Sequence, residues 1–179
     1  MDAAIICWSK TGNTEKVARV IKESLEANGV QVTYKRAEEA HDLDWFSYDL
    51  VCLGFPSYQW SPPAPVDKLL KEKIAGYRKL GRVKTCAPKI PGKNALVFCT
   101  YSGPHTGIDE ALPACKYAGQ FFAHLGFTVF DDWCIIGEFH GSEANSTRGP
   151  LGDIRGRPNE EDLAKVKKDV AGLLKRLLS

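Results

Sequence analysis

Short apolar runs alternate along the chain with longer stretches whose apolar residues recur at helical spacing. Residues 3–7 form the first apolar run, and residues 14–28 follow it with Val17 and Ile21 on one face of a predicted helix. Gly29 is expected to end that helix. Further strands are predicted at 30–35, 49–53, 95–99 and 127–136, and further helices at 66–75, 109–125 and 159–178.

Strands that alternate with helices predict a parallel sheet covered by helices on both faces, with right-handed crossovers. The chain has 179 residues, the size of one domain, so we predict a single doubly wound α/β domain over residues 1–179 with a five-stranded sheet. In such a sheet the loops after the carboxyl ends of the strands meet at one edge, where ligands bind.

Composition removes several classes of function. A net charge of +2, without a stripe of basic residues interleaved with aromatic ones, argues against nucleic acid as a partner. No window holds the ~18 consecutive apolar residues of a membrane span, and no export signal precedes the first strand, so we expect a cytoplasmic protein. The six cysteines include no Cys-x-x-Cys pair, which favours free, packed thiols over disulfides or a metal centre.

Basic residues gather in one interval of the sequence. No acidic residue lies between Glu72 and Asp109. The basic residues of this interval are Lys73, Arg78, Lys79, Arg82, Lys84, Lys89 and Lys93. Two interpretations remain open, a solvated surface or a surface that docks an acidic redox partner such as a ferredoxin.

The loop after the first predicted strand combines small, hydroxyl and amide side chains and leads directly into the first helix. It reads Ser9-Lys10-Thr11-Gly12-Asn13-Thr14. A helix start offers unpaired backbone amides and the positive end of the dipole, and Gly12 lets the backbone approach a ligand closely. The loop therefore predicts a phosphate site, although the same side chains would also suit a simple helix cap. Neither the nucleoside-triphosphate loop nor the dinucleotide Gly-x-Gly-x-x-Gly motif is present.

Residues 9–14 resemble the phosphate loop of the flavodoxin family, Ser/Thr-x-Thr-Gly-x-Thr, in composition and in position between the first strand and the first helix. The order of predicted elements is similar to that of a short flavodoxin over nearly the whole chain. This resemblance implies a flavodoxin-like fold with strand order 2-1-3-4-5 and flavin mononucleotide (FMN) as the cofactor.

The resemblance also implies that two further loops flank the flavin ring. The loop after the third strand supplies Pro56, Ser57, Tyr58, Gln59 and Trp60, and the loop after the fourth supplies Thr100, Tyr101, Ser102, Gly103, His105 and Gly107. Trp60 or Tyr58 is expected to stack on one face of the ring and Tyr101 on the other. Residues 140–158 form an additional loop that either covers the edge of the flavin or binds a partner.

The leading functional prediction is an FMN-binding protein that exchanges electrons with a redox protein such as a ferredoxin or a reductase. One alternative is an FMN-dependent NAD(P)H or quinone reductase with a small-molecule substrate, although no separate nicotinamide motif is present. A third is a phosphate-binding or signalling domain without flavin; a receiver domain is disfavoured because no acidic pair ends the first strand. No catalytic residue is assigned.

Overall fold

The computed structural model describes residues 1–130 and 132–178. The strands are β1 (Asp2–Cys7), β2 (Gln31–Arg36), β3 (Leu50–Pro56), β4 (Asn94–Tyr101), β5 (Thr128–Val129) and β6 (Trp133–Ile136). The α-helices are α1 (Asn13–Glu26), α2 (Ala64–Lys79), α3 (Leu112–His124), α4 (Glu143–Thr147) and α5 (Glu160–Leu178). Short 3-10 turns cover Ala37–Glu39, Trp45–Ser47 and Gly107–Glu110. Within the described ranges, no helix combines the length and the apolar character needed to cross a membrane.

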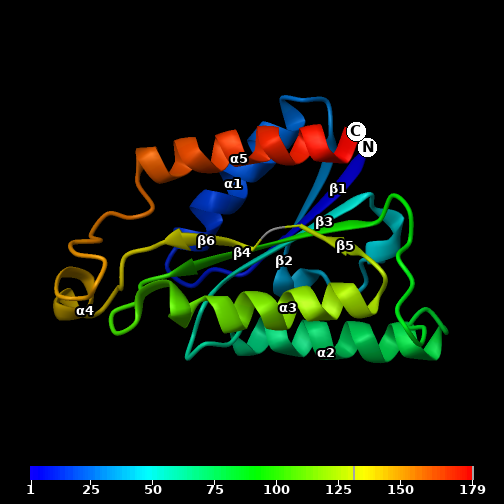
Figure 1. Cartoon of the computed structure of the whole chain (residues 1–179), viewed down its shortest axis with the longest axis horizontal. Coiled ribbons are helices and arrows are strands. Elements are labelled where there is room, and N and C mark those ends of the chain that lie inside the picture. Colours follow the sequence, from blue (N-terminus) through cyan, green and yellow to red (C-terminus); the bar gives the residue numbers. More distant parts are fainter. Residues whose placement is uncertain (131, 179) are drawn as a thin grey trace.

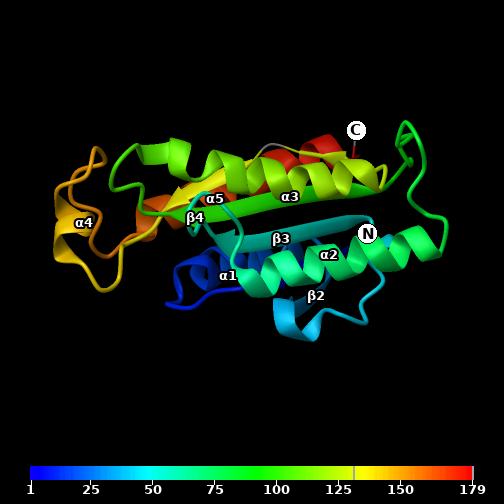
Figure 2. The same ribbon diagram turned by 90° about the horizontal axis from the view of Figure 1, so that it is seen from below.

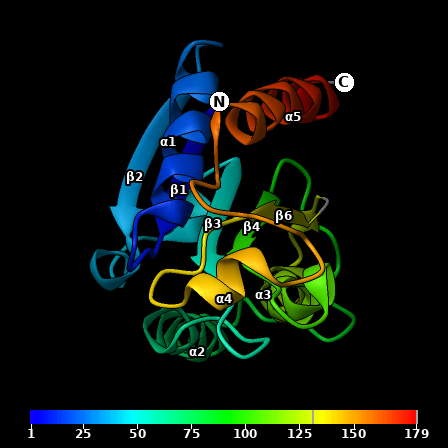
Figure 3. The same cartoon turned by 90° about the vertical axis from the view of Figure 1, so that its left-hand side faces the viewer.

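The sheet separates two layers of helices (Figures 1 and 3). All paired strands are parallel, in the order β2-β1-β3-β4-β5, with β6 pairing with β4 beyond the end of β5. Helices α1 and α5 cover one face, where Ile21 and Leu173 are buried, and α2 and α3 cover the other, where Leu69 and Phe122 are buried. The predicted doubly wound α/β fold and its strand order are confirmed.

Helix boundaries follow the turn-forming residues. The backbone at Gly29 has φ +78°, a left-handed conformation that ends the turn after α1. Helix α2 begins two residues earlier than predicted because Pro65 lies in its first turn, where the missing amide hydrogen costs no helical bond, and it continues beyond residue 75 to Lys79. Helix α3 begins at Leu112 rather than at residue 109, with a 3-10 turn before it.

The prediction of one long strand at 127–136 is wrong. Val129 pairs with Ala95 and Trp133 pairs with Phe98, so β4 advances by three residues while its partner advances by four. The segment between Val129 and Trp133 thus has one residue more than the matching segment of β4, and an extra residue of this kind interrupts the ladder of hydrogen bonds between two strands. The strand is therefore divided into β5 and β6; residue 131, within the predicted strand, lies outside the described residues.

All six cysteines are free thiols. Burial raises the pKa of Cys7 to about 12 and holds the pKa of Cys52 well above its usual range. The sulfurs of Cys115 and Cys134 approach to 3.7 Å between α3 and β6. Cys86 differs from the others because it is exposed, in the loop that precedes β4.

Candidate functional site

A cleft of about 810 Å³ opens at the carboxyl ends of the parallel strands. We call it the carboxyl-edge cleft. Its walls are the loops after β1, β3 and β4 and the segment after β6. It is lined by Ser9, Lys10, Thr11, Asn13, Thr14, Pro56, Ser57, Tyr58, Gln59, Trp60, Thr100, Tyr101, Ser102, Gly103, Pro104, His105, Glu110, Gly137, Glu138, Phe139, His140 and Asn145. Every residue predicted for the site lines this cleft except Gly12 and Gly107.

The loop after β1 turns sharply into α1 at Gly12, which has φ +95°. The Gly12 amide donates to the hydroxyl of Ser9 at 3.1 Å, and this bond holds the turn. Gly12 is the N-cap residue of α1 and brings no side-chain acceptor to the first turn. The first amides of an α-helix have no intrahelical partner, so this end of the cleft presents N–H donors to an anion.

Two side chains of this loop fix it to its surroundings. The hydroxyl groups of Thr14 and Thr100 lie 2.7 Å apart in the buried interior and join α1 to β4. The side-chain amide of Asn13 donates to the carbonyl of Glu138 at 3.0 Å. Asn13 and Thr14 were predicted as direct ligands, and their polar side-chain atoms also position the loop.

The loop after β3 folds into a tight turn without glycine. Tyr58 and Ser61 exchange two backbone hydrogen bonds of 3.0 Å, and Gln59 and Trp60 between them have φ +48° and +63°. The turn leaves 61% of Trp60 and 43% of Tyr58 exposed at the cleft. The ring of Trp8 meets the Tyr58 ring edge-on, with centroids 5.9 Å apart.

The loop after β4 is held by the Glu110 carboxylate, which accepts the amides of His105 and Thr106 at 2.8 Å each. The hydroxyl of Ser57 donates to the Glu110 carbonyl at 2.5 Å and thereby joins this loop to the one after β3. Tyr101 lines the cleft but is only 8% exposed and packs in the core under α2 and α3. Its ring therefore offers a ligand less stacking surface than Tyr58 or Trp60.

Residues 137–158, which we call the strap, contribute a wall of the cleft; the sequence had left open whether residues 140–158 cover the flavin edge or bind a partner. The strap includes α4 and lies at the carboxyl end of the sheet (Figures 1 and 2). The Ser146 hydroxyl bonds to both backbone groups of Phe139, and the Ile154 amide donates to the Ser146 carbonyl at 2.8 Å. The Nε2 of His140 lies 3.5 Å from the side-chain oxygen Oδ1 of Asn13. The length of the irregular stretch was its only signal in the sequence.

Glycine is needed at one position of the loop after β4. A Cβ on Gly103, which has φ +52°, would stand 2.5 Å from the carbonyl oxygen of Gly107, whereas a Cβ on Gly107 meets nothing closer than 3.8 Å. Both residues have positive φ, so alanine at either costs about 1 kcal/mol in strain. We expect Gly103→Ala to lower the free energy of unfolding by about 2 kcal/mol and Gly107→Ala by about 1 kcal/mol, measured by urea denaturation. Equal losses would show that the contact with Gly107 does not matter.

The chain is similar in sequence to known proteins. Residues 4–84 match the model of the flavodoxin domain family. The chain is 30% identical over 97 residues to a flavodoxin from Megasphaera elsdenii, a match that covers 54% of this chain. The chain is thus similar in sequence to flavodoxins over about half of its length. That match spans 63% of the length of the Megasphaera elsdenii flavodoxin. Residues 4–84, which match the family model, contain the loops after β1 and β3.

Solved structures extend the likeness of fold to the whole chain. A flavodoxin from the domain Archaea superimposes with a TM-score of 0.64, at 18% identity, over 100% of both chains. The oxidised flavodoxin 1 from Bacillus cereus superimposes with a TM-score of 0.67, at 15% identity, over 98% of both chains. At these identities the likeness establishes the fold, including the half of the chain beyond residue 84.

Proposed function

We propose that this flavodoxin-like chain binds FMN in the carboxyl-edge cleft and exchanges electrons with a redox protein. The observation that carries the proposal is the pairing, in one cleft, of an uncapped helix start and an open aromatic turn. One end suits a phosphate and the other suits a flat ring, which are the two ends of FMN.

The residues at the helix start fit a phosphate monoester. The first-turn amides of α1 would bind the phosphate oxygens, with the positive end of the helix dipole behind them. Lys10 and Thr11 are exposed in the same loop and line the cleft, so they add a positive charge and a hydroxyl donor. The loop thus matches a phosphate without needing a metal ion.

The opposite end of the cleft fits an aromatic ring system. Tyr58 and Trp60 are exposed there, and stacking of each aromatic ring on a ligand ring contributes about 0.5–1.5 kcal/mol beyond buried area. The bonds that tie Glu110 to His105, Thr106 and Ser57 hold the facing loop in place before a ligand arrives. When bound, FMN supplies the capacity to accept and release electrons.

A protein partner is supported by the rim of the cleft. Tyr58, Trp60 and Phe139 are the large apolar side chains that are both exposed and part of the cleft lining among the described residues. Exposed aromatic residues beside a ligand site are typical of surfaces that bind another protein. A partner that covers this rim would stand next to the cofactor. The cytoplasmic location and the choice between a ferredoxin and a reductase stay predictions.

The strap favours a second candidate function, an FMN-dependent NAD(P)H or quinone reductase. Phe139, His140 and Asn145 add a wall beside the cofactor loops, in a cleft of about 810 Å³. Clefts of this size hold small-molecule ligands, and a wall that encloses the cofactor would give a substrate a site of its own.

One experiment separates the two candidates. We would load the protein with FMN, reduce it anaerobically with dithionite, and mix it with cytochrome c as a one-electron protein acceptor in a stopped-flow instrument. In parallel, NADPH and menadione would be added to the loaded protein without any reductase. The proposed function predicts rapid oxidation by cytochrome c and no turnover of NADPH. We expect Trp60→Ser to slow the first reaction, because the partner loses an apolar contact.

The outcomes are distinct. Sustained NADPH oxidation with menadione would contradict the proposed electron carrier and support the reductase. Failure to bind FMN at all, with a folded protein, would contradict both candidates.

A further inference from the structure

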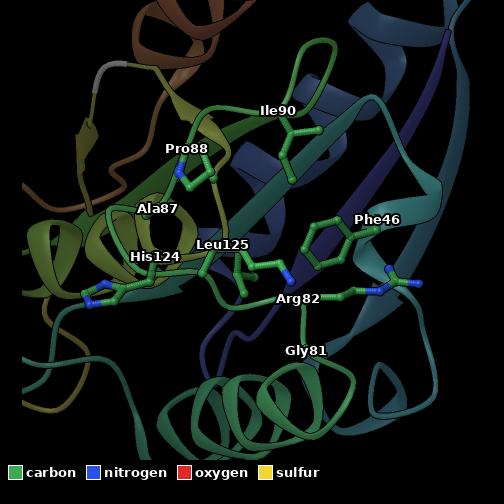
Figure 4. Close-up of a pocket in the computed structure, with 10 residues that line it drawn as sticks. Phe46, Gly81, Arg82, Ala87, Pro88, Ile90, His124 and Leu125 are labelled. Atoms are coloured by element: carbon green, nitrogen blue, oxygen red, sulfur yellow. The ribbon is translucent and has the colours of Figure 1, made fainter.

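A second cavity, of about 400 Å³, lies at the opposite end of the sheet from the carboxyl-edge cleft (Figure 4). We call it the amino-edge cavity, because its residues precede the first residues of β3, β4 and β5. It is lined by Phe46, Gly81, Arg82, Lys84, Ala87, Pro88, Ile90, His124, Leu125 and Gly126. In Figure 1 the loop 80–93 stands at the right-hand end of the molecule, whereas α4 and the strap stand at the left.

The walls of this cavity are held in place by specific contacts. The Arg82 guanidinium lies over the ring of Phe46, 4.7 Å from its centroid, and pairs with Asp44 at 3.2 Å. The amide of Ile90 donates to the carbonyl of Gly126 at 2.9 Å. Phe46, Ile90 and Leu125 surround the same space in Figure 4. The cavity is therefore preformed rather than a gap between mobile loops.

Three of the seven basic residues of the basic interval have a structural role. The ammonium group of Lys73 donates to the carbonyls of His41 and Leu43 at 2.6 Å each. Lys89 donates to the carbonyl of Phe127 at 2.5 Å, and Lys93 to that of Tyr48 at 2.9 Å. These three lysines fasten loops to the sheet, which explains much of the charge asymmetry seen in the sequence.

The basic interval is also poorly placed for electron transfer. An acidic protein docked on it would be separated from the carboxyl-edge cleft by the length of β4, eight residues or about 26 Å of extended chain. The remaining basic side chains must therefore be explained by something other than a redox partner.

Lys84 is the basic residue that the cavity leaves available. Three of the described residues that line the cavity are basic, and among them the side chain of Lys84 has no hydrogen-bond or ion-pair partner. Arg82 is paired with Asp44. The Nδ1 of His124 lies 2.8 Å from the backbone carbonyl oxygen of Gln120. The other lining residues are apolar or glycine. The site thus combines one available positive charge with an apolar interior.

The two helices that end at this cavity limit the charge of a ligand. Both α2 and α3 have their carboxyl ends here, and these ends carry partial negative charge. They oppose a dianion such as phosphate, whereas a single negative charge is balanced by Lys84. We propose that the amino-edge cavity binds a small organic monoanion, an aromatic or aliphatic carboxylate, with its apolar body against Phe46, Ile90 and Leu125 and its carboxylate on Lys84.

The test uses 2-naphthoate as the probe and the protein saturated with FMN, so that the carboxyl-edge cleft is filled. Titration followed by amide chemical shifts should show one saturable site, with the largest shifts at Phe46, Lys84, Ile90 and Gly126. The uncharged 2-naphthamide should bind at least about tenfold more weakly, as should 2-naphthoate to Lys84→Gln, because each loses one charge-assisted hydrogen bond. Lys79→Gln, an exposed lysine at the same helix end outside the cavity, is the matched control and should leave affinity unchanged.

A second variant, Ile90→Trp, should fill the cavity and abolish binding while the rest of the amide spectrum stays native. Shifts confined to the carboxyl-edge cleft, equal affinities for naphthoate and naphthamide, or no saturable binding would overturn the proposal. So would a dimer in sedimentation that buries these same amides, since the face would then join two copies of the chain. Because the amide shifts locate the probe directly, the result does not depend on whether FMN is the natural cofactor.

Discussion

FMN should bind this protein at least about a thousandfold more tightly than riboflavin, which lacks the phosphate. The phosphate would receive charge-assisted hydrogen bonds from the first-turn amides of α1 and from the exposed hydroxyl of Thr11. Each such bond contributes roughly 1.5–3 kcal/mol, and 1.4 kcal/mol is a tenfold change in affinity, so three bonds exceed about 4 kcal/mol. Quenching of flavin fluorescence on titration with the protein would measure both dissociation constants.

Variants of the loop after β1 separate direct contacts from positioning. Thr11→Ala should weaken FMN about tenfold, leave riboflavin unchanged and leave the free energy of unfolding unchanged, because Thr11 is exposed. Thr14→Ala should also lower the free energy of unfolding by about 1–2 kcal/mol, because the buried hydroxyl of Thr100 loses its partner. Thr85→Ala, exposed at the far end of the molecule, is the control. Equal affinities of the wild-type protein for FMN and riboflavin would contradict the assignment of the phosphate site.

The part of the site that was predictable from the sequence is the part built from local structure. Residues 9–14 run from the end of β1 into the first turn of α1, and the conformation of a helix start is determined mainly by such neighbouring residues. The strap depends instead on tertiary contacts, such as the bond between Asn13 and Glu138, which are 125 residues apart. No periodicity or motif in a single sequence reports a contact of that kind.

The environment of Tyr101 follows from strand alternation. Side chains alternate between the two faces of a strand, and Val97, Cys99 and Tyr101 of β4 all belong to the core layer under α2 and α3. The expectation that Tyr101 stacks on a ligand came from the resemblance to flavodoxins and did not take this alternation into account. The division of the predicted long strand into β5 and β6 had no comparable signal, because it depends on the register against β4.

Gly54→Ala should lower the free energy of unfolding by about 3 kcal/mol, the largest loss expected from a single methyl group in this chain. Gly54 lies in β3 opposite Phe98 of β4, and a Cβ at this position would overlap the ring of Phe98. That ring is fully buried under α1 and α5 and has no open space to move into. Overpacking of a close-packed core typically costs 1–3 kcal/mol, and a clash with a fixed ring belongs at the upper end.

Urea denaturation followed by circular dichroism measures this loss, and Gly76→Ala is the matched control. Gly76 lies inside α2 with open space around its Cα, so alanine there should raise the free energy of unfolding by about 0.5–1 kcal/mol. The loss in free energy of unfolding of the double variant Gly54→Ala/Phe98→Leu should be smaller than the sum of the losses of the two single variants, because removal of the ring relieves the overlap. Strictly additive losses would place the cause elsewhere in β3.

The Gly54 carbonyl also accepts the amide of Trp8 at 2.9 Å, at the entrance to the loop after β1. A shift of β3 that makes room for the methyl group should therefore also weaken FMN binding, whereas Gly76→Ala should leave it unchanged.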